Sequence, residues 1–141
     1  MLTPGQKVPD IDLPLTIQAR FELAKQNPEN FTMLVFYRGK HCPICKRYLE
    51  ELGSKVEKFT ELGVSPFAIS MDSKERAMVS HKEWDTQNLP LVYDLSEDQA
   101  REWGLFISEK RPDSEEPERF SEPGVFLIKP DGTLFFEEVQ S

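Results

Sequence analysis

The sequence has only two cysteines, fewer basic than acidic residues and no long apolar segment. The last two shortages argue against particular classes of protein and partner. No apolar stretch approaches the length of a membrane span, and residues 1–7 lack the charged-then-apolar pattern of a secretory signal. The 25 Asp and Glu residues outnumber the 17 Lys and Arg residues, so the formal net charge is −8. Nucleic acids and anionic membranes bind positive surfaces, which argues against both as partners. We expect a cytoplasmic protein, in a compartment that keeps thiols reduced.

The only two cysteines stand three residues apart, in the motif Cys42-Pro43-Ile44-Cys45. The motif follows the apolar segment 31–37 and opens a helical pattern, with Pro43 at the first helical position, where a missing N–H costs nothing. Two cysteines at this spacing lie on one face of a helix, within the separation that a disulfide requires. The motif therefore predicts thiol–disulfide exchange. We expect Cys42 to be the more exposed sulfur and Cys45 to face the body of the protein.

The charge around the cysteine pair is opposite to that of the whole chain. No acidic residue occurs between positions 37 and 47. Together with the positive end of the helix dipole, the cations of this segment favour the thiolate, which is the nucleophilic form of cysteine. These cations are Arg38, Lys40, Lys46 and Arg47.

The first half of the chain predicts one βαβ unit. With 141 residues, 38% of them hydrophobic, the chain has enough apolar material for one domain over residues 1–141. Residues 1–30 contain four prolines and predict an irregular arm, with a short strand near 11–15 and a weakly helical turn at 19–26. Strands are predicted at 31–37 and 64–71. The helix between them, from 44 to 63, is predicted to bury a stripe formed by Ile44, Tyr48, Leu52, Val56 and Phe59. Two strands joined in this way are parallel.

The second half continues the alternation and ends in a hairpin. The expected elements are a helix from a cap at 72–73 to residue 88, a strand at 91–93, a short helix after the capping box 96–99, an acidic loop at 108–123, and a hairpin of strands 125–128 and 133–136. This order predicts an α/β fold with helices on both faces of a mixed sheet, parallel at its centre and ending in an antiparallel hairpin.

Several segments together resemble the thioredoxin fold. Within that fold they are similar to the peroxiredoxin-like proteins of the alkyl hydroperoxide reductase and thiol-specific antioxidant family. The resemblance covers nearly the whole chain and implies a thioredoxin-like three-layer sandwich that binds no cofactor. The segments that carry it are PGQKVPD at 4–10, LVFYRG at 34–39, LPLVYD at 89–94, Trp103-Gly104 and FLIKPDG at 126–132, in addition to the cysteine motif.

The resemblance implies two chemistries for the cysteines. In peroxiredoxins, the cysteine that attacks peroxide falls at Cys45, and a Thr that helps to hold the peroxide falls at Cys42. In thioredoxin-like reductases both positions are cysteines, the first attacking and the second resolving, which is the pattern found here. Peroxiredoxins also place an Arg where this chain has Pro123, a residue that resembles the cis-Pro that thioredoxins set against their disulfide. A peroxidase would therefore need Arg38 or Arg119 as a substitute.

Three functions follow from these observations. The first is a thiol–disulfide oxidoreductase in which Cys42 attacks a disulfide and Cys45 resolves the mixed disulfide. The second is a thiol peroxidase in which Cys45 attacks a hydroperoxide and Cys42 resolves the sulfenic acid. Either enzyme would be recycled by a thioredoxin- or glutathione-type reductant. The third is a non-catalytic binding module that uses the acidic loop 109–122.

Two further expectations concern His41 and the end of the chain. His41 is interpreted either as a loop residue or as a stabiliser of the thiolate, and a zinc site formed by the cysteines with His41 and His81 fits the usual ligand spacing poorly. Thioredoxin-like domains usually continue after the hairpin into a helix that covers one face of the sheet, and residues 137–141 are too few for one. We expect the N-terminal arm or a symmetric partner, in a homodimer, to cover that face.

Overall fold

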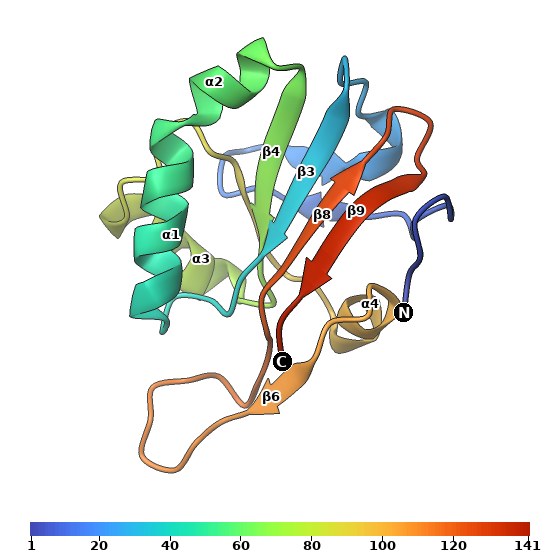
Figure 1. The fold of residues 1–141 in the computed structure, drawn as a ribbon. Coiled ribbons are helices and arrows are strands. Elements are labelled where there is room, and N and C mark those ends of the chain that lie inside the picture. The colour runs from blue at the N-terminus through green and yellow to red at the C-terminus, as the bar shows by residue number, and fades with distance from the viewer.

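The strand that leads to the cysteine pair lies in the middle of a five-stranded sheet. A computed structural model describes residues 1–141. Strand β3 (Phe31–Phe36) pairs in parallel with β4 (Val64–Ile69) and antiparallel with β8 (Gly124–Ile128). Strand β5 (Leu91–Val92) extends the parallel side, and β9 (Leu134–Val139) extends the antiparallel side (Figure 1). The predicted mixed sheet, with its parallel centre and final hairpin, is confirmed.

The parallel crossovers place α1 (Pro43–Ser54), α2 (Val56–Glu61) and α3 (Lys74–Glu83) on one face of the sheet, and α4 (Glu97–Glu102) lies on the other (Figure 1). The predicted capping box at the start of α4 is present, with Ser96 and Gln99 bonded reciprocally. Helix α3 ends earlier than predicted. None of the four α-helices has the length and apolar character needed to cross a membrane.

The single helix predicted between residues 44 and 63 is in fact two helices, because the chain turns at Lys55. Gly53 and Ser54 precede the break, and the Ser54 hydroxyl donates to the carbonyl of Glu51 at 2.6 Å, a contact that bends helices. Gly53 also lies against the backbone of Thr86, where a Cβ would come within 2.7 Å of the Thr86 carbonyl carbon. The small residue is therefore needed for packing, although it weakens the helix.

The buried face of α1 includes Leu52, as predicted, but differs from the predicted stripe in the first two turns. Cys45, Leu49 and Leu52 point into the core, whereas the side chains of Ile44 and Tyr48 are 66% and 50% exposed. Both groups of residues have the spacing of one helix face, so either could be the buried face of α1. The face that carries Cys45 is the buried one, because both cysteine sulfurs pack among apolar side chains on the α1 side of the sheet.

The N-terminal arm is more regular than predicted. The strand predicted near 11–15 is confirmed as β1 (Asp12–Pro14), which pairs antiparallel with the unpredicted β2 (Arg20–Glu22). The expected helical turn shortens to a 3-10 helix, η1 (Leu23–Lys25). The start of the chain is tied to its end, since the Gly5 N–H donates to the Leu134 carbonyl at 2.7 Å and an isolated β-bridge joins position 7 to position 133.

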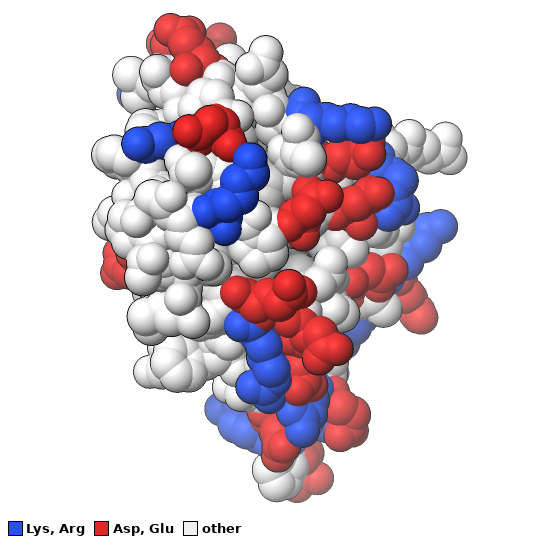
Figure 2. Space-filling view, turned by 90° about the vertical axis from the view of Figure 1, so that its right-hand side faces the viewer, with Lys and Arg blue, Asp and Glu red and all other residues white.

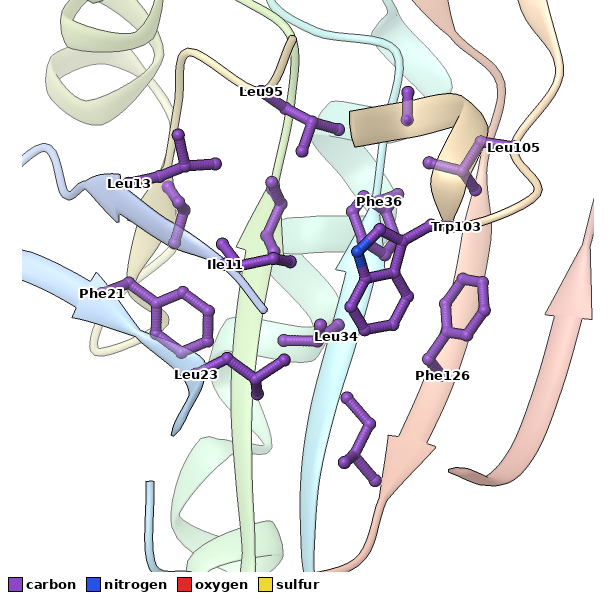
Figure 3. Close-up of a cluster of buried hydrophobic side chains, with 14 of the residues drawn as sticks. Ile11, Leu13, Phe21, Leu23, Leu34, Phe36, Leu95, Trp103, Leu105 and Phe126 are labelled. Carbon is purple, nitrogen blue, oxygen red and sulfur yellow. The ribbon is translucent and has the colours of Figure 1, made fainter. Parts of the chain in front are cut away.

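The arm covers the face of the sheet opposite α1. Ile11 and Phe21 from the arm, Leu34 and Phe126 from the sheet, and Trp103 after α4 belong to one buried cluster (Figure 3). The Trp103 ring meets the Phe126 ring edge to face at 5.1 Å, an arrangement that stabilises aromatic packing. The arm therefore covers the face of the sheet opposite α1.

The α1 side of the last hairpin stays partly open. Phe135 and Phe136 of β9 are 51% and 43% exposed. The corresponding side of the molecule, at the left of Figure 2, carries few charged side chains. A symmetric partner on this face stays a prediction.

The acidic segment 108–123 is not an unstructured loop. Its ends pair as β6 (Ile107–Glu109) and β7 (Arg119–Ser121), which form a separate hairpin that projects beyond the main sheet below α1 (Figure 1). The sequence pattern did not show it, because each strand has only three residues.

Candidate active site

The cysteine pair forms the first turn of α1. Cys42 is the N-cap residue and Pro43 occupies the first helical position, as predicted. The backbone N–H of Cys45 donates to the Cys42 sulfur at 3.2 Å, so this sulfur takes the part that a Ser or Asp oxygen plays in ordinary caps. Both cysteines are free. The prediction that Cys42 is the more exposed is wrong: Cys42 is 5% and Cys45 6% exposed, because the Cys42 side chain folds back over the helix start.

One cation touches a cysteine sulfur. The Nη1 of Arg38 lies 3.9 Å from the sulfur of Cys42, whereas no contact joins a sulfur to the other three cations of the segment. The same guanidinium is held by Glu122, whose Oε1 accepts from Nε at 2.8 Å and lies 2.7 Å from Nη2. The second carboxylate oxygen, Oε2, accepts from the Ser108 hydroxyl at 2.6 Å. Glu122 is nearly buried, so it fixes the direction in which Arg38 points.

The two thiols have opposite acidities. A hydrogen bond from the Cys45 thiol, the Cys45 backbone N–H and the Arg38 guanidinium, acting against burial, lower the pKa of Cys42 to about 6. The pKa of Cys45 is raised, first because its thiol hydrogen-bonds to Cys42 and then because it is buried. Near neutral pH, Cys42 is therefore the thiolate and Cys45 the thiol that donates to it.

The side chain of Asp72 holds the turn between β3 and α1 in place. Its buried carboxylate accepts from the Lys40 backbone N–H at 2.8 Å and from Arg76 Nε at 3.1 Å. Gly39 has φ +133°, and a Cβ at this position would lie 2.6 Å from Asp72 Oδ1, so only glycine lets the turn close on the carboxylate. Asp72 was predicted as part of the cap of α3, but Ser73 makes that cap alone.

His41 supports the wall of the site rather than the thiolate. Its ring packs on Phe120 with 4.6 Å between centroids, and its Nδ1 lies 3.5 Å from Nη2 of Arg76. Burial is the first cause that lowers the pKa of His41, which favours the neutral ring. No hydrogen bond joins it to either sulfur, so the interpretation as a thiolate stabiliser is not supported. Nowhere in the structure do three or more His, Cys, Asp or Glu side chains converge as metal ligands.

Pro123 and Arg119 differ from what the resemblance implied. The peptide bond before Pro123 is trans, as are all others in the structure. The proline continues directly into β8, and its carbonyl accepts from the Gln140 N–H at 2.9 Å, so an extended trans chain satisfies the ladder there. Arg119 pairs with Glu97 at 3.2 Å and Glu109 at 3.4 Å and contacts neither cysteine. Arg38 is the arginine of this site.

Each cysteine opens to its own depression, and each depression has a volume of about 500 Å³. The first, here called the Cys42 cleft, lies between the start of α1 and the β6–β7 hairpin and is lined by Arg38, His41, Cys42, Pro43, Ile44, Ser108, Glu109, Arg111, Glu116, Phe120 and Glu122. The second, the Cys45 groove, lies between α1 and the ends of β8 and β9 and is lined by residues 35–38, Ile44, Cys45, Tyr48, residues 123–125, Glu138 and Gln140.

Comparison with known proteins gives one family match. The family model of the AhpC/TSA family matches residues 4–136. A comparison with curated proteins found no match.

Among solved structures, the chain is similar to peroxidoxin BcpB from Mycobacterium tuberculosis, with 18% identity, a TM-score of 0.77, and coverage of 98% of this chain and 86% of that one. It is also similar to AhpC from Enterococcus faecalis, with 16% identity, a TM-score of 0.80, and coverage of 100% and 83%. A third structure, assigned as a thiol:disulfide interchange protein DsbE from Chlorobium tepidum, shares 19% identity with a TM-score of 0.75 and coverage of 99% and 86%.

These structural matches establish the thioredoxin-like fold. Because the family match spans nearly the whole chain and the site holds a cysteine pair with one activated thiolate, the protein is a thiol-dependent oxidoreductase that belongs to the AhpC/TSA family.

Proposed function

We propose that the protein is a thiol–disulfide oxidoreductase in which Cys42 is the attacking cysteine and Cys45 the resolving one. The observation that carries this proposal is the asymmetry of the pair. The Cys42 sulfur accepts a hydrogen bond from the Cys45 backbone N–H and contacts the Arg38 guanidinium. The pKa of Cys42 is lowered to about 6, while the pKa of Cys45 is raised. The thiolate is the nucleophile in disulfide exchange, so attack starts at Cys42.

The reaction proceeds in two displacements. The Cys42 thiolate attacks one sulfur of a substrate disulfide, forms a mixed disulfide and releases the other substrate sulfur as a thiolate that takes up a proton. Cys45 then attacks the Cys42 sulfur, forms the Cys42–Cys45 bond and releases the second substrate thiolate, which accepts the Cys45 proton. The substrate gains two electrons and the protein dithiol loses two.

The hydroperoxidase alternative requires the reverse order. Cys45 would have to be the thiolate that attacks the peroxide oxygen, but its thiol is a hydrogen-bond donor to Cys42 in this site. Arg38, the only arginine at the pair, lies against the sulfur of Cys42. The geometry therefore favours a disulfide over a hydroperoxide as substrate. An antioxidant role and a cytoplasmic location remain part of the proposal, with a reducing pool that returns the protein to the dithiol.

Two single variants test the order of attack. Cys45→Ser should react with hydroxyethyl disulfide and stop as a stable mixed disulfide at Cys42, whereas Cys42→Ser should react no faster than a free thiol. Both variants should also be mixed with hydrogen peroxide in a stopped-flow instrument, with a dimedone-type probe for sulfenic acid. Rapid sulfenic acid formation in Cys42→Ser would overturn the reductase in favour of the peroxidase.

A further inference from the structure

The two sulfurs are reached from different sides of the molecule. Cys42 lines the Cys42 cleft and Cys45 lines the Cys45 groove, and only Arg38 and Ile44 border both. The cleft is bounded by the β6–β7 hairpin, and the groove by the ends of β8 and β9 (Figure 1). A reagent that enters one depression therefore meets a different cysteine from a reagent that enters the other.

This separation matters once the Cys42–Cys45 disulfide has formed. A thiolate attacks a disulfide in line with the S–S bond, so it approaches each sulfur from the side away from the other sulfur. Attack on Cys42 must then come through the cleft, and attack on Cys45 through the groove.

The linings of the two depressions differ in polarity. Three carboxylates line the cleft, those of Glu109, Glu116 and Glu122, and each of them is paired with an arginine. The groove is lined mostly by apolar side chains, with Glu138 as its only carboxylate. A reductant that presents its thiol among apolar groups therefore fits the groove better than the charged cleft.

The leaving group gives the same preference. A thiolate that attacks Cys45 expels Cys42, whose negative charge the Cys45 N–H and Arg38 stabilise. A thiolate that attacks Cys42 expels Cys45, whose pKa is raised by its hydrogen bond to Cys42 and by burial, although the backbone N–H and the charge of Arg38 act in the opposite direction. Disulfide exchange is faster when the departing thiol has the lower pKa.

We propose that the reductant of the oxidised protein enters the Cys45 groove and attacks Cys45, so that substrate and reductant use opposite sides of the cysteine pair. The inference rests on the proposed function and gives the chemical class of the reductant in the half-reaction that returns the protein to its dithiol form. The groove fits a dithiol that presents its thiol among apolar groups. One thiolate of this dithiol bonds to the Cys45 sulfur and releases the Cys42 thiolate. The second thiol of the donor then attacks the donor sulfur that is bonded to Cys45. The donor disulfide closes, Cys45 leaves and takes up the proton as a thiol, and two electrons have passed to the protein.

The site of attack can be read directly. Protein oxidised to the Cys42–Cys45 disulfide is mixed with 2-mercaptoethanol, a neutral monothiol that cannot complete the reduction within one adduct. The reaction is quenched in acid within milliseconds, free thiols are alkylated, and both cysteines are mapped by mass spectrometry. We expect the mercaptoethanol adduct on Cys45 and the alkyl group on Cys42, in excess over the reverse product by on the order of tenfold. An equal distribution, or adduct mainly on Cys42, would overturn the inference.

The route of entry is tested by variants at the mouth of the groove. Tyr48 is half exposed there, and Tyr48→Glu adds a carboxylate in the path of the thiolate, while Tyr48→Phe keeps the apolar surface. Phe106→Glu is the matched control, because this aromatic side chain is 49% exposed and lines neither depression. The ratio of the rate of reduction by dihydrolipoamide to the rate of oxidation by hydroxyethyl disulfide should fall in Tyr48→Glu by on the order of tenfold and stay unchanged in the other two. An unchanged ratio in Tyr48→Glu would refute entry through the groove.

Failure of the proposed function would look different. If the reduced wild-type protein reacts with hydroxyethyl disulfide no faster than a free thiol, the oxidoreductase assignment is lost, whichever cysteine carries the adduct. If that oxidation is rapid and the mercaptoethanol adduct lies on Cys42, the oxidoreductase assignment stands, and only the proposal that substrate and reductant use opposite sides of the pair is refuted.

Discussion

Removal of the Arg38 charge should raise the pKa of Cys42 by an amount that the structure allows to be worked out. At the 3.9 Å between Nη1 and the sulfur, Coulomb's law gives about 4 kcal/mol at an effective dielectric constant of about 20 and about 1 kcal/mol in bulk water. The side chain of Arg38 is 34% exposed and already shares its charge with Glu122, so the lower figure applies. With about 1.4 kcal/mol for each pKa unit, Arg38→Gln should move the Cys42 pKa from about 6 to about 7.

The measurement is the rate of alkylation at Cys42 by iodoacetamide as a function of pH, resolved by mass spectrometry. Because only the thiolate reacts, the rate in the wild type should rise with pH through a midpoint of about 6 and level off above it. Arg38→Gln should follow the same curve displaced to higher pH, and Arg38→Lys should lie between the two, since it keeps the charge but loses the forked contact with Glu122.

Arg47→Gln serves as the matched control. Arg47 carries the same charge in the same helix, but it is exposed and contacts neither sulfur. Its replacement should move the midpoint by no more than a few tenths of a pKa unit. If Arg38→Gln leaves the midpoint where the wild type has it, the assignment of Arg38 to the thiolate is refuted.

Three other expectations can be checked in solution. Leu49→Ala should lower the free energy of unfolding by about 2–5 kcal/mol in urea titrations, because this leucine is fully buried between α1 and the sheet; a loss below about 1 kcal/mol would contradict that packing. Gly53→Ala, which normally strengthens a helix by about 1 kcal/mol, should instead destabilise the protein, since the new methyl group would meet the Thr86 backbone; a gain in stability would show that this contact relaxes freely. The reduction potential of the pair should fall by about 59 mV per pH unit below pH 6 and by about 30 mV per unit above it, because the reduced form binds two protons below the Cys42 pKa and one above it; a single slope up to pH 8 would contradict the low pKa of Cys42.

Local patterns were sufficient to predict most of the scaffold. Short apolar runs bounded by turn residues predicted β3, β4 and the β8–β9 hairpin close to their observed bounds, because each element is specified by residues adjacent in the chain. The position of Cys42 as the N-cap of α1 also followed from the sequence, since cap, proline and helical spacing all lie within one turn.

The charge environment of the site could not be predicted in this way. The segment around the cysteines has no acidic residue of its own, and yet folding brings Glu122 to Arg38 and Asp72 to Lys40 across separations of 84 and 32 residues. Such pairs depend on the three-dimensional path of the chain, on which hydrophobic periodicity carries no information. Gly39, next to Lys40, is needed there because a Cβ would collide with the Asp72 carboxylate, but its sequence position does not reveal this partner.

The errors in the elements have a different cause. In the arm, the strand predicted near 11–15 is present as β1, but β2 lies in the segment that was predicted as a helical turn. On α1, the large side chains of Ile44 and Tyr48 dominated the apolar pattern, although the smaller Cys45 occupies the buried position. Short elements and small side chains give weak periodic signals.

The hydrogen bond between Gly5 and Leu134 joins two segments that are far apart in the sequence. The isolated β-bridge between Lys7 and Thr133 strengthens the same pairing. Because contacts this distant in sequence slow folding, we expect the arm to dock beside β9 in one of the late steps of folding.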